Sequence, residues 1–310
     1  MIKRTLYFGN PAYLSLKNEQ MVVKLPGVEK SNASEIIKKE SVTTIPIEDI
    51  GVVVLDCQQL TITQGLIEHL LDNNCALISC DFHHLPVGLM LPLCGNTTQT
   101  ERFRNQIEVS LPLKKQLWQQ TIRAKILNQM TVLDNATNDT HNCMRVWADD
   151  VRSGDSDNME ARAAAYYWRN LFPNVDGFVR NRDGVNPNKL LNYGYAILRA
   201  IIARSLVSSG LLPTLGIFHH NKYNAYCLAD DIMEPYRPYV DKIVLDIIDS
   251  YGIDTDLTKE VKVAFLSIPV IDVVIDGRKS PLMIAASTTT ASLAACFAGE
   301  QRKISYPLMQ

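Results

Sequence analysis

Histidine and carboxylate side chains gather in one short stretch of the sequence, residues 216–238, GIFHHNKYNAYCLADDIMEPYRP. His219 belongs to a histidine doublet in a polar segment, and three acidic residues follow in what the pattern predicts as the first turns of a helix. Asp230 and Glu234 share one helix face, and Asp231 and Glu234 are neighbours three residues apart. A histidine with one or two carboxylates is a ligand set that divalent metals accept. The stretch therefore predicts part of a metal site.

A further candidate carboxylate, Glu160, stands at the start of another predicted helix. Asp157 lies three residues before it, which is the spacing of a capping box, so helix capping alone would explain Glu160. The face that follows is apolar and includes Ala163, Tyr167 and Leu171. A glutamate near the buried side of such a face needs a partner or a metal ion. The local sequence leaves both roles open.

Composition limits the classes of function. The chain has 310 residues, and at about 100–200 residues per domain we expect two domains. Hydrophobic residues make up 46% and charged residues 21%, as in proteins with a full hydrophobic core. The net charge is −2 and the pI is about 6.3, so a general attraction for nucleic acid is excluded. Binding to DNA would need a local basic strip.

The cysteines and the apolar runs indicate a cytoplasmic protein. The seven cysteines are scattered without a CxxC pair, and several stand in apolar runs, so we expect reduced, buried thiols. The N-terminal residues lead directly into an alternating strand pattern, and we expect no signal peptide. We read no run of about 18 apolar residues in the chain, and we therefore expect no membrane span.

Periodicity divides the chain into β-rich residues 1–95 and helical residues 96–310. The expected fold class is α+β, with a small N-terminal β-rich domain followed by a larger all-α domain. Strands are expected over residues 5–8, 13–16, 21–25, 43–47, 51–56, 75–80 and 86–93. Helices are expected over residues 63–72, 102–113, 114–133, 160–172, 190–210, 239–250, 257–267 and 280–297.

The segments between these elements are less regular. Residues 31–41 are expected to form a loop or a short surface helix, and residues 134–157 a polar linker or loop. Residues 272–280 are compatible with a short strand and a turn.

Basic side chains load one side of the predicted helix over residues 114–133. Lys114, Lys115, Arg123 and Lys125 stand opposite its apolar positions. A solvated helix face is the expected role of such charges, and a strip that contacts phosphates is the alternative.

Several blocks of sequence together resemble the CRISPR-associated integrase family, the catalytic subunit of the spacer-acquisition complex. The blocks follow a β-rich start and read EARAAAYYW from Glu160, NPNKLLNYGYAIL from Asn186, GLLPTLGIFH from Gly210 and LADDIMEPYRP from Leu228. A single block is weakly specific, whereas all of them in this order are highly specific. The NYGY and MEPYRP blocks look like the branch that accompanies the single-protein (type II) effector nuclease.

The resemblance implies catalytic and metal-binding roles for Glu160, His219 and Glu234, with Mg²⁺ or Mn²⁺ as the metal ion. His219 is preferred over His220 because it holds the fourth place of the GIxH pattern. Asp231 and His220 would orient the ligands or act as additional ligands, Asp231 as the residue that orients His219. Candidate DNA contacts are Arg162, Arg180, Arg182, Lys222 and Arg237, with Arg123 and Lys125 on the helix described above.

The family's reaction is a metal-dependent transesterification that inserts a short foreign DNA, the protospacer, into a CRISPR array for antiviral defence. The resemblance implies double-stranded DNA as substrate and an N-terminal domain that forms a homodimer. Two such dimers would flank a small ferredoxin-like adaptation protein in a heterohexamer, and the type II effector nuclease is a possible further partner. Two alternatives use the same residues: a metal-dependent nuclease acting on branched or single-stranded DNA, and a non-catalytic scaffold that binds DNA ends.

Overall fold

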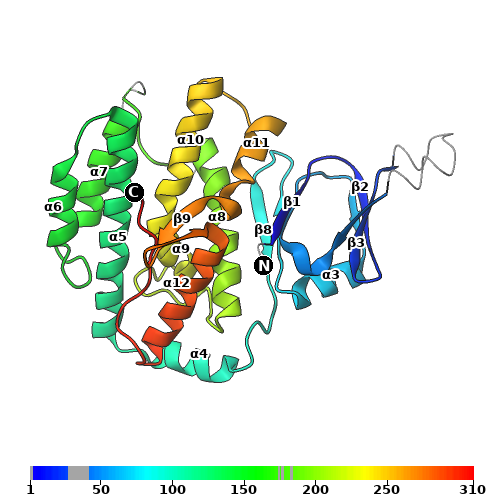
Figure 1. Ribbon diagram of the computed structural model, residues 1–310, viewed down its shortest axis with the longest axis horizontal. Helices are drawn as coiled ribbons and strands as arrows, with labels where there is room; N and C mark the ends of the chain where they lie inside the picture. Colours follow the sequence, from blue (N-terminus) through cyan, green and yellow to red (C-terminus); the bar gives the residue numbers. More distant parts are fainter. Residues whose placement is uncertain (1–2, 27–41, 174, 176–177, 182–183) are drawn as a thin grey trace. The chain divides into compact units, whose positions relative to one another are not determined.

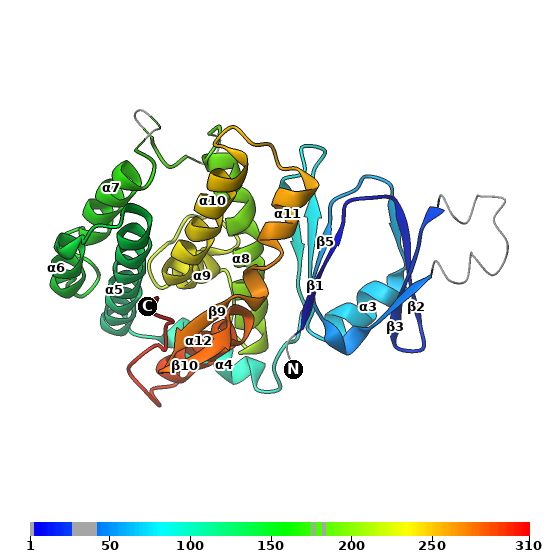
Figure 2. The same ribbon diagram turned by 45° about the horizontal axis from the view of Figure 1, so that its top comes forward.

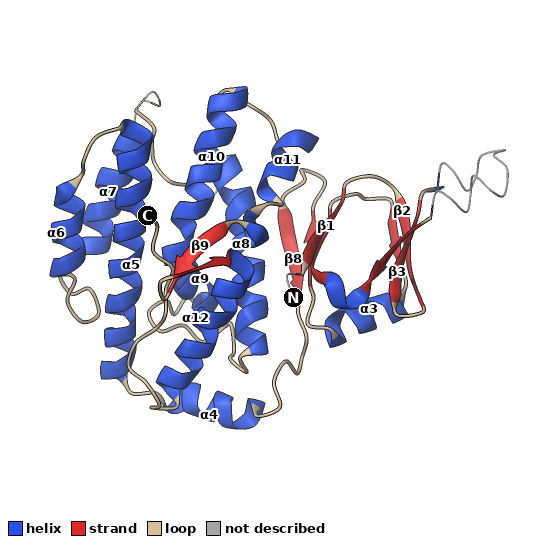
Figure 3. Cartoon of the chain, viewed as in Figure 1, coloured by secondary structure: helices blue, strands red, loops and turns tan. Residues whose placement is uncertain are grey.

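The chain folds into two compact units, residues 1–93 and residues 94–310. Strands dominate the first unit and helices the second (Figure 3), which confirms the mixed α+β class. The computed structural model describes residues 3–26, 42–173, 175, 178–181 and 184–310. The expected loop over residues 31–41 lies outside these residues.

Two four-stranded sheets make up most of the N-terminal unit. In the first sheet, with strand order β1-β5-β7-β8, β8 is antiparallel to β7 and the other pairs are parallel. In the second, with order β4-β3-β2-β6, only β6 runs parallel to its neighbour. The strands are β1 (Arg4–Phe8), β2 (Ala12–Lys17), β3 (Gln20–Lys24), β4 (Thr43–Pro46), β5 (Ile50–Leu55), β6 (Leu60–Ile62), β7 (Ala76–Cys80) and β8 (Pro86–Met90).

Local sequence accounts for the elements of this unit. The run IGVVVL of β5 is buried almost throughout, as expected for a strand between two parallel neighbours. Asn18 and Glu19 adopt positive φ angles in the two-residue turn that joins β2 to β3. Helix α3 (Gln64–Asp72) lies between the sheets (Figure 2) and adds Leu66 and Leu70 to their shared core. The strands predicted over residues 13–16 and 21–25 and the helix over residues 63–72 are confirmed, and the short strand β6 was not predicted.

Helices dominate the described part of the C-terminal unit (Figure 1). The nine α-helices of this part are α4 (Gln99–Glu108), α5 (Leu111–Thr137), α6 (Asn142–Asp150), α7 (Met159–Leu171), α8 (Asn188–Ser208), α9 (Cys227–Met233), α10 (Arg237–Tyr251), α11 (Lys259–Phe265) and α12 (Leu282–Phe297). A single 3₁₀ turn, η2 (Glu234–Tyr236), joins α9 to α10.

The helical unit also contains the short strand and turn that the sequence suggested over residues 272–280, as an antiparallel hairpin of β9 (Asp272–Ile275) and β10 (Arg278–Pro281). One prediction for this unit was wrong. Residues 134–157 are not a linker or loop, since they contain the helix α6. This short helix buries Met144 and Ala148 and packs against α5 and α7, so tertiary contacts stabilise it in spite of its polar sequence.

The helix α8 forms the centre of the unit. Its residues are apolar almost all round, and it packs against α9, α10 and α12. Gly210 follows its C-terminus with a φ of +75°, as expected for a glycine just beyond a helix end. Within the described chain, α8 is long and apolar enough to cross a membrane, judged by length and composition alone. The sequence analysis did not expect such a segment. Most of α8 is buried inside the protein, as in the core helix of a globular protein.

A substitution in α8 tests this close packing. A Cβ atom added at Gly194 would lie 2.4 Å from Val240 Cγ1 and 2.8 Å from Phe265 Cε1. We expect Gly194→Ala to destabilise the protein by about 1–3 kcal/mol, because α8 would have to move away from α10 and α11. Thermal unfolding followed by circular dichroism measures the effect. Gly65→Ala in α3 is the control, since nothing lies within 4 Å of its added Cβ, and an equal loss in both variants would contradict the explanation.

Candidate metal centre

Three elements of the C-terminal unit place charged side chains around one point. Glu160 lies in the first turn of α7, and Glu234 begins the turn η2 after α9. Lys125, in the middle of α5, lies between them. Its Nζ is 2.7 Å from Glu160 Oε1 and 2.7 Å from Glu234 Oε2. Two carboxylates from separate helices therefore converge on a single ammonium group.

The position of Lys125 corrects the sequence prediction. It was placed with Arg123 on a polar face of its helix, but Lys125 is only 8% exposed. Burial disfavours its charged form, yet the negative charges of Glu234 and Glu160 outweigh this effect and raise the pKa of Lys125. Lys125 is therefore a charged residue of the site interior and not part of a solvated strip.

Glu234 is held from two sides. Its side chain is 6% exposed, and Arg237 Nη2 lies 3.0 Å from Oε1. Burial opposes its ionisation, but Arg237 and Lys125 lower the pKa of Glu234 below its usual value. The contact of Oε2 with Lys125 lacks hydrogen-bond geometry, and no described residue donates a hydrogen bond to this buried oxygen. Glu234 thus presents an ionised carboxylate whose buried Oε2 lies against the ammonium of Lys125.

Capping does not explain Glu160. The helix α7 begins after Asn158, and the carboxylate of Asp155 accepts hydrogen bonds from the backbone N–H groups of Met159 and Glu160 at 2.8 and 3.0 Å. Asp155, and not Asp157 as predicted from the sequence, therefore caps the N-terminus of α7. The side chain of Glu160 accepts a hydrogen bond from Lys125 instead.

Asp231 organises the loop that carries His219. This fully buried carboxylate accepts backbone hydrogen bonds from Ile217 at 2.7 Å and Phe218 at 2.9 Å, with a longer one from His219. Its Oδ1 lies 2.5 Å from His219 Nδ1. The loop also packs on Trp118, whose ring stacks on that of Phe218 at a centroid distance of 4.2 Å.

The bond to Asp231 fixes how His219 can act. Because Nδ1 faces Asp231, Nε2 is the ring nitrogen that remains for a metal ion or a substrate. The hydrogen bond with Asp231 raises the pKa of His219, with smaller contributions from the charges of Glu234 and Glu160. His220 is exposed and is not the ring that Asp231 holds. These contacts favour His219 over His220 as the functional histidine.

The residues fit a hard divalent ion by their chemistry. Glu160, Glu234 and His219 offer two carboxylates and one oriented imidazole, a donor set suited to Mg²⁺ or Mn²⁺. The buried Glu234 Oε2, without a hydrogen-bond donor among the described residues, is the sign of such a role in the structure. The described side chains do not include three His, Cys, Asp or Glu residues already arranged around a metal position. Lys125 lies between the two carboxylates instead.

A buried network positions Arg237 beside the site. The guanidinium of Arg237 lies 4.8 Å from the ring centre of Tyr195, and that of Arg180 lies 5.0 Å from the same centre. The Tyr195 hydroxyl donates to Asp241 Oδ1, and the Tyr167 hydroxyl donates to Asp241 Oδ2 at 2.9 Å. Asp241 thus links α7, α8 and α10. The sequence analysis did not identify Asp241 or Tyr195 as functional.

The other predicted DNA contacts are dispersed. Arg162 and Lys222 are exposed and lie over the rings of Trp147 and Tyr223. Arg123 forms an exposed ion pair with Asp149, and Arg182 lies outside the described residues.

Lys125 could have been identified from spacing. It lies seven residues after Trp118 and three after Ile122, so it shares the buried stripe of α5 with both. A single lysine on such a stripe indicates a buried charge, which needs carboxylate partners.

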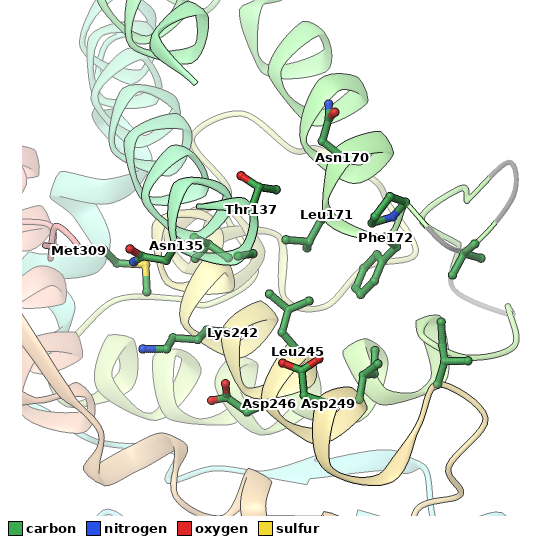
Figure 4. A pocket seen from close by; sticks show the side chains of 16 residues that line it. Asn135, Thr137, Asn170, Leu171, Phe172, Lys242, Leu245, Asp246, Asp249 and Met309 are labelled. Atoms are coloured by element: carbon green, nitrogen blue, oxygen red, sulfur yellow. The ribbon is translucent and has the colours of Figure 1, made fainter. Parts of the chain in front are cut away.

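A cavity of about 400 Å³ lies elsewhere in the unit, between the ends of α5 and α7 and the side of α10 (Figure 4). Phe172, Leu171 and Leu245 give it an apolar lining, with Lys242 and Asp246 among its polar groups. The described residues that line it do not include those of the candidate metal centre.

Comparisons with known proteins identify relatives of the chain. The family described as "CRISPR associated protein Cas1" matches residues 6–275. The "CRISPR-associated endonuclease Cas1" of Neisseria meningitidis serogroup C is 38% identical over 263 residues, which cover 84% of this chain and 81% of the relative.

Solved structures share the fold. A "Casposase bound to integration product" has a TM-score of 0.75 and 18% identity, covering 98% of this chain and 92% of the casposase chain. A chain of a "Cas6-RT-Cas1--Cas2 complex" has a TM-score of 0.72 and 19% identity, covering 97% of this chain and 36% of the other.

The buried carboxylate of Asp241 generates a prediction on pH. Burial raises its pKa to about 6, although the hydrogen bonds from Tyr195 and Tyr167 oppose the shift. The folded state therefore holds this proton more tightly than the unfolded state, and wild-type stability should fall as pH rises from about 4 to 6. Asp241→Asn has no carboxyl group to titrate at this position. Between pH 4 and pH 6, its free energy of unfolding should therefore rise by about 2–3 kcal/mol relative to that of wild type. Urea unfolding at several pH values measures the difference, and a difference that does not change with pH would contradict the prediction.

Proposed function

Because this chain belongs to the CRISPR-associated protein Cas1 family, we propose that it is a metal-dependent DNA endonuclease and integrase that inserts protospacers into a CRISPR array. The curated relative from Neisseria meningitidis is named an endonuclease, and the casposase neighbour is described with an integration product. The substrate would be double-stranded DNA, as a protospacer and as the CRISPR repeat. A prokaryotic cytoplasm is the proposed location.

One observation supports this function above the others. Glu160 and Glu234 approach the same ammonium at 2.7 Å, and the charges of both act on His219. These three residues come from α7, the loop before α9, and the turn η2, far apart in the sequence. The two carboxylates converge on one ammonium, and we propose that His219 completes the set of oxygen and nitrogen donors that a metal-dependent phosphoryl transfer requires.

The reaction proposed is a transesterification. The oxygen of the protospacer 3′-hydroxyl attacks a phosphorus atom at the edge of the repeat, a new phosphodiester forms, and the 3′-oxygen of the cleaved repeat strand leaves with a proton. Mg²⁺ or Mn²⁺, when bound, supplies charge stabilisation at the attacking and leaving oxygens. Glu160, Glu234 and His219 would hold the ion, while Asp231 keeps Nε2 of His219 turned toward it. No protein nucleophile is required.

Two other functions use the same residues. A nuclease acting on branched or single-stranded DNA would need the same metal ligands but would not join strands. A strand-transfer assay with a plasmid that carries a CRISPR repeat distinguishes this enzyme from an integrase. A non-catalytic scaffold for DNA ends would keep Glu160 and Glu234 as ion-pair partners of Lys125, and isothermal titration with Mn²⁺ would then detect no binding at the site.

The proposed ligands generate a direct prediction. We expect Glu160→Ala, His219→Ala and Glu234→Ala each to reduce strand joining by at least about 100-fold. Loss of a residue that only hydrogen-bonds to a metal ligand already lowers metal affinity or activity by up to about 100-fold, and loss of the ligand itself should have a larger effect. The assay is integration of a labelled protospacer into a repeat-bearing plasmid, with circular dichroism as a check on folding.

The histidine doublet supplies the matched control for this experiment. His220→Ala changes the same residue type one position away on the exposed part of the loop, and it should leave strand joining near the wild-type rate. Integration that persists in folded Glu160→Ala, or equal losses in the two histidine variants, would exclude the proposed ligand set.

Assembly with other proteins forms part of the proposal. The structural neighbour named above is described as a complex with Cas2, and this supports a partner of that kind here. We propose a homodimer through the N-terminal unit, residues 1–93, with two dimers flanking a small ferredoxin-like adaptation protein in a heterohexamer. The type II effector nuclease would join during protospacer capture.

This assembly can be tested in solution. Light scattering after size-exclusion chromatography should show a dimer of the chain alone and a larger complex once the small partner is added. Integration at the repeat should require that complex. A monomer that integrates at the wild-type rate without the partner would contradict the prediction.

A further inference from the structure

We propose that Lys125 is a built-in cation of the metal centre, which neutralises the two carboxylates when no divalent ion is bound and must leave Glu234 for the ion to enter. This inference rests on the proposed function. It assigns to Lys125 a positioning role that sets how tightly the site holds its metal.

The geometry places the ammonium where the carboxylates converge. Nζ of Lys125 lies 2.7 Å from one oxygen of Glu160 and 2.7 Å from one oxygen of Glu234. A magnesium ion binds oxygen at about 2.0–2.1 Å. An ion that bound both of these oxygens would have to compete with Nζ for them. The ammonium would therefore have to give up at least one of its two contacts.

The charges show why a cation is present at all. Glu160 and Glu234 bring two negative charges, and Lys125 and Arg237 bring two positive charges, so these four groups sum to zero. Arg237 contacts only Glu234 among the two carboxylates. Without Lys125, the remaining charges of this cluster would sum to −1 in a buried setting, which is costly. A divalent ion could replace Lys125 in this role.

The two contacts of Lys125 differ in kind. Toward Glu160, the ammonium donates a hydrogen bond of good geometry. Toward Glu234, it is close to Oε2 without a hydrogen bond, and no other described residue donates to that oxygen. Glu234 is therefore the carboxylate that should exchange its partner first. Lys125 can keep its bond to Glu160 Oε1 while Glu234 Oε2 turns to the ion.

Titration calorimetry with MnCl₂ on the full chain tests the inference. We expect Lys125→Met to bind Mn²⁺ at least about tenfold more tightly than wild type, because a competing positive charge is removed from the ligand oxygens. Lys125→Arg, which keeps the charge, should bind no more tightly than wild type. Lys115→Met changes an exposed lysine on the same helix and should have no effect. Equal or weaker Mn²⁺ binding by Lys125→Met would overturn the inference.

Thermal stability gives a second reading with the same proteins. In EDTA, Lys125→Met should melt at a lower temperature than wild type, and saturating Mn²⁺ should remove most of the difference. A difference that stays the same in Mn²⁺ would show that Lys125 acts only as a structural ion pair and would overturn the inference.

If Lys125→Met does not fold, the inference can be tested with the wild-type protein. Acetylation of lysines by an N-hydroxysuccinimide ester, followed by mass spectrometry, reports whether Lys125 becomes accessible. Its rate should rise on addition of Mg²⁺, and an unchanged rate at saturating Mg²⁺ would overturn the inference.

Two further variants separate this inference from the proposed function. If wild type binds Mn²⁺ and neither Glu160→Gln nor His219→Ala does, the proposed metal centre is supported. If, in addition, Lys125→Met binds Mn²⁺ with the affinity of wild type, only the proposed role of Lys125 is excluded. If wild type takes up no Mn²⁺, the metal centre itself is wrong and the inference falls with it.

Discussion

A buried lysine that contacts two carboxylates from different elements holds the centre of the C-terminal unit together. Glu234 is buried and Glu160 is partly exposed, and both lie 2.7 Å from the ammonium of Lys125. Lys125 and Arg237 compensate these negative charges inside the protein. Strong charges in a buried site also bind their ligands strongly, because the surroundings screen them weakly. The same arrangement of charges would prepare the site for the proposed metal ion.

Two other aspartates hold this arrangement in place. Asp231 ties the His219 loop to α9 through backbone hydrogen bonds, and Asp241 joins α7, α8 and α10 through two tyrosines. Neither needs to touch a substrate to matter. Each carboxylate joins its own helix to another part of the unit, so each helps to fix the orientation of a side chain at the site. The ring of Tyr195 likewise helps to fix the position of the Arg237 guanidinium.

Sequence patterns predicted the elements where local forces suffice. The turn at Asn18 and Glu19, the buried strand β5 and the apolar helix α8 follow from backbone preference and hydrophobic content alone. The pattern failed for α6, whose polar sequence is helical only because α5 and α7 cover its apolar side. It also failed at the start of α7, where Asp155, in a left-handed turn, caps the helix in place of Asp157.

The sequence by itself determined the family, and its ordered motifs proposed Glu160, His219 and Glu234 as one set. Those residues lie in short blocks whose chemistry is readable without coordinates. Only the tertiary structure decided that Lys125 belongs with them. The helix α5 is covered by other elements over most of its circumference, from Trp118 to Leu133. On such a helix, spacing can place Lys125 beside the buried Trp118 and Ile122, but it cannot identify the partners of the buried charge. The direction of a lysine is then set by which carboxylates the neighbouring helices bring within reach.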